Sequence, residues 1–199
     1  MGKVEQNKQL KLEKLMASAQ ELFMSKGLVE TSISDITNHA GVAKGTFYLY
    51  FKDKYSIRDS LVSRSSRKLF LAAHNALKEK PEITGFEDKI IFIIDHIVAE
   101  LENNRPLFYF ISKNLSWGLF HHMFTEDVAD HMTGQEIFEQ VAKECNVTIK
   151  DPDIMGFIII EMTNSATYSA LFGNEQIPME RLLPYINDTV RAIIRNHMI

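Results

Sequence analysis

The chain has 199 residues, of which 45% are hydrophobic and 24% charged, with 9 Gly, 5 Pro and a net charge of −4; this composition excludes disordered and collagen-like classes and favours an ordered, helix-rich protein. Its apolar runs are too short to cross a bilayer and its polar start does not resemble a signal peptide, so we expect no membrane contact and a cytoplasmic location. The lone Cys145 excludes an intramolecular disulfide and fits that reducing compartment.

The negative net charge is unevenly distributed. Residues 1–58 carry 9 Lys and Arg against 6 Asp and Glu, whereas residues 59–199 carry 13 against 20. A basic N-terminal segment before an acidic remainder indicates that the N-terminal segment binds a polyanion. Chance clustering of charges explains so small an excess equally well. The distribution alone leaves both interpretations open.

Residues 8–26 have the pattern of an amphipathic helix that ends at Gly27. Their apolar side chains recur at intervals of three and four residues: Leu12, Leu15, Met16, Ala19, Leu22 and Phe23. A second, shorter helix follows, because Thr31 and Ser32 offer N-cap hydroxyls and Asp35 completes a capping-box pattern with Ser32. Gly41 ends this helix, and Val42 supplies an apolar residue in the turn.

A third helix is predicted from about Lys44 to Phe51. Phe47 and Phe51 are four residues apart and face the core together. Polar and aromatic side chains remain on the other faces: Lys44, Thr46, Tyr48 and Tyr50. Two short helices joined by a glycine turn behind a supporting helix are typical of a helix-turn-helix, whose second helix enters the major groove of DNA.

Residues 10–60 resemble the DNA-binding domain of the tetracycline-repressor (TetR) family. The resemblance lies in the order and spacing of five short motifs: TSISDI at 31–36, AGV at 40–42, KGTFY at 44–48, YF at 50–51 and KDK at 52–54. A lone Ala-Gly-Val would be weak support, but the chained pattern over some twenty residues is specific. Ala43 departs from the family pattern, which has a serine or threonine there more often.

The resemblance implies an all-α protein with two domains. Residues 1–54 would form the N-terminal three-helix, helix-turn-helix DNA-binding domain, and residues 55–199 a larger helical domain for ligand binding and dimerisation. It also implies the residues that contact DNA: Thr31, Ser32, Lys44, Gly45, Thr46, Tyr48, Tyr50 and Lys54. Ser32 would offer its hydroxyl and backbone N–H to a phosphate, and Lys54 would pair with a phosphate behind the N-cap Asp53.

The body continues with longer helices. A linking helix runs from residue 55 to about 79, a strongly apolar one spans 86–103, and another covers about 135–145. Asp151 followed by Pro152 predicts the N-cap of a long helix to about Phe172, and Pro178 opens a last helix. By resemblance, the last two helices form a four-helix homodimer interface with their twofold mates; the alternative is that they complete an intramolecular core.

The stretch 107–124 is unusually rich in aromatic side chains. We expect it to wall a pocket for a small apolar or aromatic effector, although an ordinary helical core would have the same composition. The candidate ligand-binding residues are Phe108, Tyr109, Phe110, Trp117, Phe120, His121, Phe124 and Tyr168.

Metal binding and catalysis are not expected. His121 and His122 are adjacent, so their rings leave a helix in different directions and cannot easily hold one ion. No nucleophile motif or phosphate-binding glycine loop occurs, and Cys145 has no adjacent base, so we expect neither an enzyme nor a cofactor.

The combined prediction is a sequence-specific DNA-binding transcription regulator that acts as a ligand-responsive repressor. Its homodimer would read a pseudo-palindromic operator and release it when a small apolar or aromatic molecule binds the helical body. Its two recognition helices would lie roughly 34 Å apart and enter successive major grooves. Two alternatives stay open: a DNA-binding regulator controlled by a protein partner, and a helical enzyme that carries a DNA-binding head.

Overall fold

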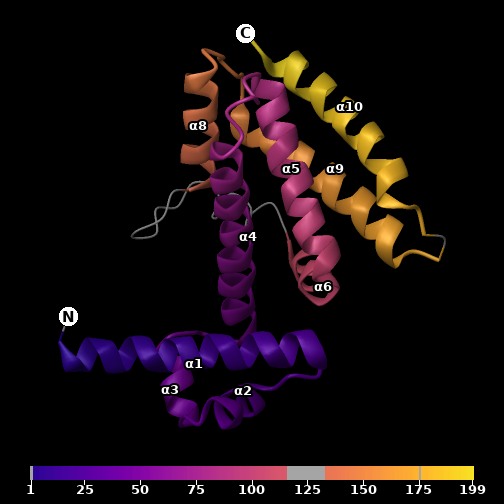
Figure 1. The fold of residues 1–199 in the computed structure, drawn as a ribbon. Helices are drawn as coiled ribbons and strands as arrows, with labels where there is room; N and C mark the ends of the chain where they lie inside the picture. Colours follow the sequence, from indigo (N-terminus) through magenta and orange to yellow (C-terminus); the bar gives the residue numbers. More distant parts are fainter. Residues whose placement is uncertain (1, 116–132, 175) are drawn as a thin grey trace. The chain divides into compact units, whose positions relative to one another are not determined.

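The computed structural model describes residues 2–115, 133–174 and 176–199, and these are helical throughout most of their length (Figure 1). The predicted all-α class is therefore confirmed. The helices are α1 (Lys3–Ser25), α2 (Ile33–Ala40), α3 (Lys44–Tyr48), α4 (Lys54–Lys78), α5 (Phe86–Asn103), α6 (Arg105–Asn114), α8 (Gly134–Glu144), α9 (Pro152–Phe172) and α10 (Met179–His197).

The chain forms two compact units, Met1–Arg64 and Ser65–Ile199. The division falls inside α4, later than the expected boundary after Lys54. Ile57 and Leu61, in the first turns of α4, are buried, so this end of the helix contributes to the core of the first unit. We call residues 1–64 the head and residues 65–199 the body.

The head is built on a small core to which all four of its helical segments contribute. The fully buried or nearly buried side chains are Leu15, Ala19, Phe23, Ile36, Phe47, Phe51, Ile57 and Leu61. The rings of Phe47 and Phe51 lie 5.6 Å apart, as their four-residue spacing predicts. The third helix is shorter than expected: it ends at Tyr48, and the chain reaches Phe51 through a turn.

Local capping fixes the turns of the head. Ser32 and Asp35 form the predicted capping box at the start of α2, and Gly41 ends this helix in a left-handed conformation (φ 65°). Gly27 follows α1 with φ 88°, which also favours glycine. Ala43 precedes α3 without a side-chain cap, consistent with its missing hydroxyl.

The core of the body lies between α5, α8, α9 and α10. Its buried residues are Phe86, Ile91, Val141, Met155, Ile159, Ile186, Val190 and Ile194. A second cluster joins α4 to α5 and α8 through Ala73, Leu77, Ile93 and Ile137. The apolar helix predicted at 86–103 thus coincides with α5, which contributes to both clusters.

Ion pairs tie α5 to its neighbours. Arg195 of α10 donates two hydrogen bonds to the carboxylate of Glu87, both at 2.9 Å, and Arg191 donates to Asp88 at 2.7 Å. The Arg195 hydrogen bond is the main reason why the pKa of Glu87 is lowered. On the other side of α5, Lys89 donates to Glu144 of α8 at 2.8 Å.

The connection between α8 and α9 is held in an unusual backbone conformation. In residues 2–115, 133–174 and 176–199, the non-glycine residues with positive φ are Asn146, at 53°, and Asp151, at 47°. Asp151 occupies the N-cap position and Pro152 follows it at the start of the helix, as predicted, although the Asp151 side chain makes no cap hydrogen bond. Between them, Ile149 pairs with Met198 in an isolated antiparallel bridge.

Within the described part of the chain, no helix combines the length and the hydrophobicity that a membrane span requires.

Candidate nucleic-acid interface and ligand cavity

The polar groups at the start of α2 mostly form hydrogen bonds with one another. The backbone N–H of Ser32 donates to the Asp35 carboxylate at 2.8 Å, and the Ser32 hydroxyl oxygen accepts from Asp35 N at 3.1 Å. These contacts and Lys26, which donates to Asp35 at 3.0 Å, lower the pKa of Asp35 to about 2. The Ser32 N–H is therefore not free for a phosphate, and only the hydroxyl proton of this exposed residue remains available.

The exposed side of α3 carries four of the predicted contact residues. Lys44, Gly45 and Tyr48 are exposed, Tyr48 to 54%, and Thr46 is partly exposed. A Cβ placed on Gly45 would meet no atom within 4 Å, so the fold itself does not require glycine there. Phe47 faces inward on the same helix and packs edge-on against the Tyr48 ring, with the ring centroids 5.6 Å apart. The buried phenylalanine thus orients the outward residues.

Lys54 has a structural environment that the sequence did not indicate. Its ammonium donates to three backbone carbonyls of the segment between α1 and α2: Leu28 at 3.0 Å, Val29 at 3.1 Å and Thr31 at 3.2 Å. These bonds use all three protons of the group. A phosphate contact would have to replace at least one of them.

Two other predicted contact residues also bond within the head. The Tyr50 hydroxyl donates to the Lys8 carbonyl of α1 at 2.9 Å. Thr31 is buried, and its hydroxyl donates to the Gly27 carbonyl at 2.7 Å. Thr31 therefore points inward, whereas Tyr50 connects to α1 and remains partly exposed.

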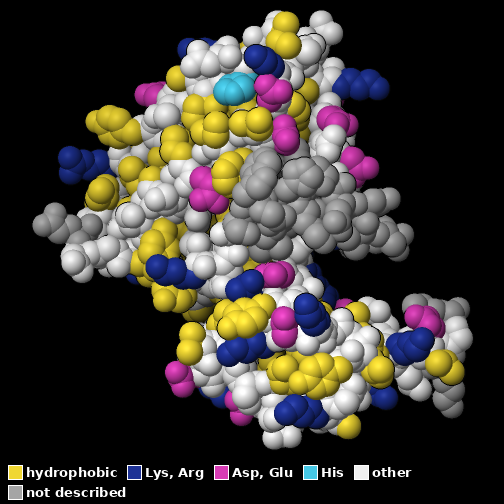
Figure 2. All heavy atoms as spheres, turned by 180° about the vertical axis from the view of Figure 1, so that it is seen from behind, with side chains coloured by type: hydrophobic (Ala, Val, Ile, Leu, Met, Phe, Trp, Pro, Cys, Tyr) yellow, Lys and Arg dark blue, Asp and Glu magenta, His cyan; other side chains and the backbone are white. Residues whose placement is uncertain are grey.

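Among the exposed large apolar residues of the head, two near the helix-turn-helix were not predicted as contacts from the sequence. Leu49, directly after α3, is 79% exposed, and Val29, in the turn after α1, is 82% exposed. Leu49 lies two residues beyond the buried Phe47, and this spacing on a helix was the signal that could have placed it outward. On the face shown in Figure 2, Lys and Arg side chains of the head lie among hydrophobic ones.

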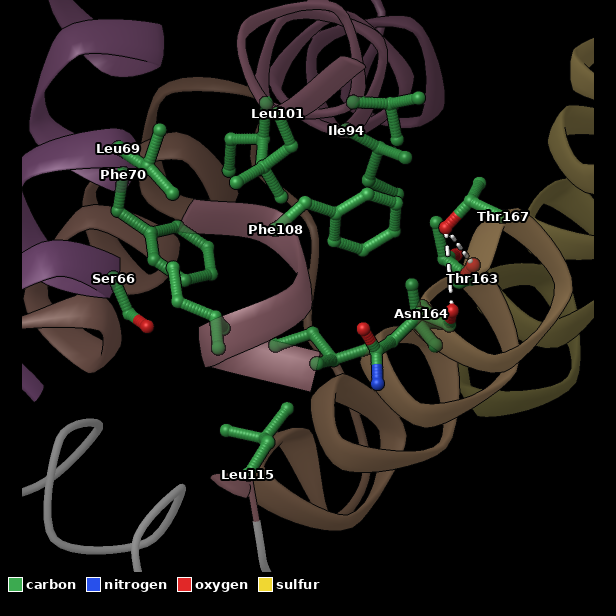
Figure 3. Close-up of a pocket in the computed structure, with 15 residues that line it drawn as sticks. Ser66, Leu69, Phe70, Ile94, Leu101, Phe108, Leu115, Thr163, Asn164 and Thr167 are labelled. Carbon is green, nitrogen blue, oxygen red and sulfur yellow. Dashed lines mark hydrogen bonds between the residues drawn. The ribbon is translucent and has the colours of Figure 1, made fainter. Parts of the chain in front are cut away.

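The body contains a cavity of about 110 Å³ between α4, α5, α6 and α9 (Figure 3). Nine of its fifteen lining residues are aliphatic: Leu69, Ile94, Ile97, Val98, Leu101, Ile111, Leu115, Ile159 and Ile160. Two are aromatic, Phe70 and Phe108. The remaining four are polar and uncharged: Ser66, Thr163, Asn164 and Thr167.

The polar side of the cavity belongs mainly to α9. Figure 3 shows Thr163, Asn164 and Thr167 across the cavity from Ser66, Leu69 and Phe70 of α4. The Thr167 hydroxyl donates to the Thr163 carbonyl at 2.7 Å, and Asn164 accepts from the Ser112 hydroxyl at 2.6 Å. The Thr163 hydroxyl is buried and has no hydrogen-bond partner among the described residues, so this wall keeps a free hydroxyl in an otherwise mostly apolar lining.

The predicted ligand-binding residues fall into three groups. Phe108 lines the cavity. Tyr109, Phe110 and Tyr168 do not line it; Tyr109 is 52% exposed and packs against Tyr168 and Phe172 with ring centroids about 6 Å apart. Trp117, Phe120, His121 and Phe124 lie outside the described residues. Most of the lining was missed because isolated aliphatic residues on separate helices carry no signature of a pocket.

His121 and His122, which were considered as metal ligands, likewise lie outside the described residues. In the described ranges, no group of three or more His, Cys, Asp or Glu side chains is arranged to hold a metal ion.

Comparisons with known proteins agree with this architecture. Residues 15–61 match the family of bacterial regulatory proteins known as the tetR family. Over 152 residues the chain is 29% identical to an uncharacterised HTH-type transcriptional regulator, YvdT of Bacillus subtilis, covering 66% of this chain and 78% of that protein. It is 33% identical over 100 residues to the fatty acid metabolism regulator protein of B. subtilis, half of each chain.

Among solved structures, a TetR-family transcriptional regulator from Streptomyces coelicolor superposes with a TM-score of 0.66 at 15% sequence identity. The match covers 95% of this chain and 98% of that one. At such low identity the likeness establishes the fold, a helix-turn-helix head with a helical body.

Proposed function

Because the chain belongs to the tetR family of bacterial regulatory proteins, we propose that it is a homodimeric repressor that releases its operator when a small aliphatic molecule binds the body. The chain is a transcriptional regulator with a DNA-binding helix-turn-helix. The ligand, the repression and the dimer are the proposed parts.

The outward side of α3 supports the assignment of the DNA-reading surface. Lys44 and Tyr48 are exposed beside Gly45, whose missing side chain leaves room for a nucleic-acid backbone. Lys44 provides positive charge, and the Tyr48 hydroxyl and ring suit a phosphate or a thymine methyl. Leu49 joins this surface as an apolar contact that is otherwise unfavourably exposed.

Binding of the purified protein to the DNA upstream of its own gene tests this surface. Replacing Lys44 by Ala should weaken binding to all sequences and reduce the slope of log K against log salt by about 1. Replacing the exposed Lys52, which lies outside α3, is the matched control. Unchanged affinity of both the Lys44→Ala and the Tyr48→Ala variant would mean that α3 is not the recognition helix.

The cavity supports an aliphatic effector over an aromatic one. Its lining is mostly Leu, Ile and Val, and none of the described lining residues is ionisable. Its volume of about 110 Å³ is comparable to that of an engineered apolar cavity of roughly 150 Å³ that holds a small molecule, and below the roughly 300 Å³ of sites for larger ligands. A small molecule or the end of a hydrocarbon chain fits. The name of the related fatty acid metabolism regulator is consistent with such a chain.

Helix α4 is the proposed route from ligand to DNA. Ile57 and Leu61 pack within the head, whereas Ser66, Leu69 and Phe70 on the same helix line the cavity. A ligand that favours one position of α4 shifts the population of DNA-binding conformers. A preference of about 1.4 kcal/mol changes DNA affinity tenfold.

Thermal unfolding with short straight-chain alcohols and fatty acids tests the effector. A binding compound should raise the melting temperature and lower operator affinity in the same concentration range. If compounds of this class neither stabilise the protein nor release DNA, control by a protein partner becomes the better explanation. Turnover of a bound compound would instead favour an enzyme.

The dimer is proposed to form through α9 and α10. Ile154 and Ile158 of α9 are 48% and 42% exposed, and Ser165 and Ser169 continue the same exposed side with small residues. Such a surface suits close packing against a second copy. Sedimentation of the wild type and of Ile158→Asp tests it: the variant should be monomeric, and a dimeric variant would place the interface elsewhere.

A further inference from the structure

Asp95 of α5 and Asn187 of α10 form a side-chain pair that is only half satisfied. The Asn187 amide nitrogen donates to Asp95 Oδ2 at 3.0 Å. The other oxygen of each side chain, Asp95 Oδ1 or Asn187 Oδ1, is shielded from solvent and has no hydrogen-bond partner among the described residues. Two buried acceptors without a donor are unfavourable, because each has lost its water without replacement. The pair therefore lacks one donor.

A proton on Asp95 supplies that donor. A carboxylic acid and a primary amide are complementary: the amide N–H donates to one carboxyl oxygen, and the acid O–H donates to the amide oxygen. The first of these two bonds is already formed between Asn187 and Asp95. The two oxygens left without partners are the two atoms that the second bond would join.

We propose that Asp95 and Asn187 are a proton-dependent clamp between α5 and α10. When Asp95 is protonated at Oδ1, two hydrogen bonds close the clamp; when it is ionised, only one remains. The pair adjoins the main core of the body, since Ile94 and Ile186 are the neighbours of Asp95 and Asn187 in sequence and both belong to that cluster. The clamp is independent of the proposed effector and operator.

The surroundings of the pair favour protonation. Burial raises the pKa of Asp95, against the smaller effect of the Asn187 hydrogen bond, which lowers it. Among the described residues, no charged side chain contributes to this shift. The charged groups at the shared end of the two helices pair with each other: Glu87 and Asp88 with Arg191 and Arg195. His96, the next residue on α5, stacks on Phe92.

The direction of the pH effect follows from this shift. Because the folded body holds the Asp95 proton at pH values where the unfolded chain has lost it, the clamp stabilises the fold in acid. This stabilisation disappears as the pH rises through the pKa of Asp95 in the folded protein.

The substitution Asp95→Asn tests the clamp in the full-length chain. An asparagine at this position carries an N–H donor at every pH, so it imitates the protonated acid. We expect the unfolding equilibrium constant of the variant to be roughly two- to tenfold smaller than that of the wild type near about pH 7.5. The difference should shrink as the pH is lowered and the wild type acquires its own proton.

Two further variants serve as controls. Asp188→Asn removes the same charge from an exposed neighbouring position and should follow the wild type at every pH. In an Asn187→Leu background, Asp95→Asn should keep a pH-dependent gain, because burial alone raises the pKa of Asp95. The clamp is tested there by the cost of Asn187→Leu, which should be similar in the wild type at acidic pH and in the Asp95→Asn variant, since both hold two hydrogen bonds. Carbon NMR of the side-chain carboxyls gives a second readout: one aspartate resonance should titrate above the others and be absent from the Asp95→Asn spectrum.

Two results would overturn the clamp. If Asp95→Asn is less stable than the wild type at every pH, the site requires a carboxylate, whose free oxygen is then satisfied by a bound water or a cation. If the difference in stability between the two proteins does not change with pH, protonation of Asp95 does not stabilise the fold.

Discussion

The ammonium nitrogen of Lys54 lies 3.2 Å from the carbonyl oxygen of Thr31, the residue that precedes the N-cap of α2. Through this bond and those to Leu28 and Val29, the first residue of α4 holds the chain segment that leads into the helix-turn-helix. The lysine therefore has a role in folding that precedes any role at DNA.

We predict that Lys54→Met destabilises the protein by about 1–3 kcal/mol, because three carbonyls lose a charged donor. Urea unfolding followed by circular dichroism measures the change. Lys52→Met, at an exposed position two residues earlier, should leave stability unchanged. A stable Lys54→Met protein with weakened DNA binding would instead identify Lys54 as a phosphate contact.

Alanine substitutions at Gly45 and Gly41 should have opposite effects on the stability of the protein. Gly45→Ala has open space for its methyl group and lies inside α3, so stability should stay constant or rise by up to about 1 kcal/mol. Operator affinity should nevertheless fall, because the methyl group faces the proposed DNA surface. Gly41→Ala should cost about 1 kcal/mol of stability, since Gly41 has φ 65°. Unaltered DNA affinity of Gly45→Ala would contradict the close approach.

Filling the cavity should separate stability from ligand response. Ser66→Leu places an apolar side chain in an apolar cavity and should raise stability by roughly 1 kcal/mol. It should also abolish stabilisation by straight-chain compounds and leave the operator permanently bound. Ala72→Leu, at an exposed position on the same helix, is the control and should respond to ligand as the wild type does. A Ser66→Leu variant that still responds would show that the effector binds elsewhere.

His74 should make the body sensitive to acid. The residue is 3% exposed, and neither ring nitrogen has a hydrogen-bond partner within the part of the chain that the structure describes. Burial is the main cause that lowers the pKa of His74 below 6.5; Lys78 and Lys89 add to it and Glu144 opposes it. The folded state therefore favours the neutral ring, and stability is lost as the pH falls through about 6.5.

The substitution His74→Leu checks this effect. The variant should gain about 1 kcal/mol or more relative to the wild type near pH 5.5, because it has no proton to bind and no unpaired nitrogens. The gain should diminish above pH 7. Parallel stability curves for the two proteins between about pH 5 and 8 would rule out a contribution from His74.

Local signals in the sequence predicted the helices well. The Ser32 and Asp35 capping box, the apolar run at 86–103 and Pro152 each mark a helix where the structure has one. Capping and periodicity depend on residues within one or two turns, which is why a single sequence carries them. The end of the third helix was predicted too late, at Phe51 instead of Tyr48. The exposure of Leu49 and the hydrogen bond from Tyr50 to Lys8 depend on contacts with a distant part of the chain, which the local pattern does not contain.

The site residues were harder to predict because their partners lie far along the chain. Lys54 bonds to residues 28–31 and Tyr50 to residue 8, and neither pairing leaves a local pattern. The many aromatic residues from 107 onward predicted a pocket wall on α6, and Phe108 of this helix does line the cavity. The aliphatic residues that form most of the lining come from four helices, and nothing in their spacing distinguishes them from ordinary core.

The two left-handed residues around the α8–α9 connection limit how this segment can vary between relatives. Asn146 and Asp151 adopt a conformation that strains every side chain with a branched Cβ, while Asn, Asp and Gly tolerate it. Natural variants should therefore keep to these three residue types at both positions, even where the residues between them change freely. A relative with valine or isoleucine at either position would be expected to connect α8 to α9 by a loop of different length.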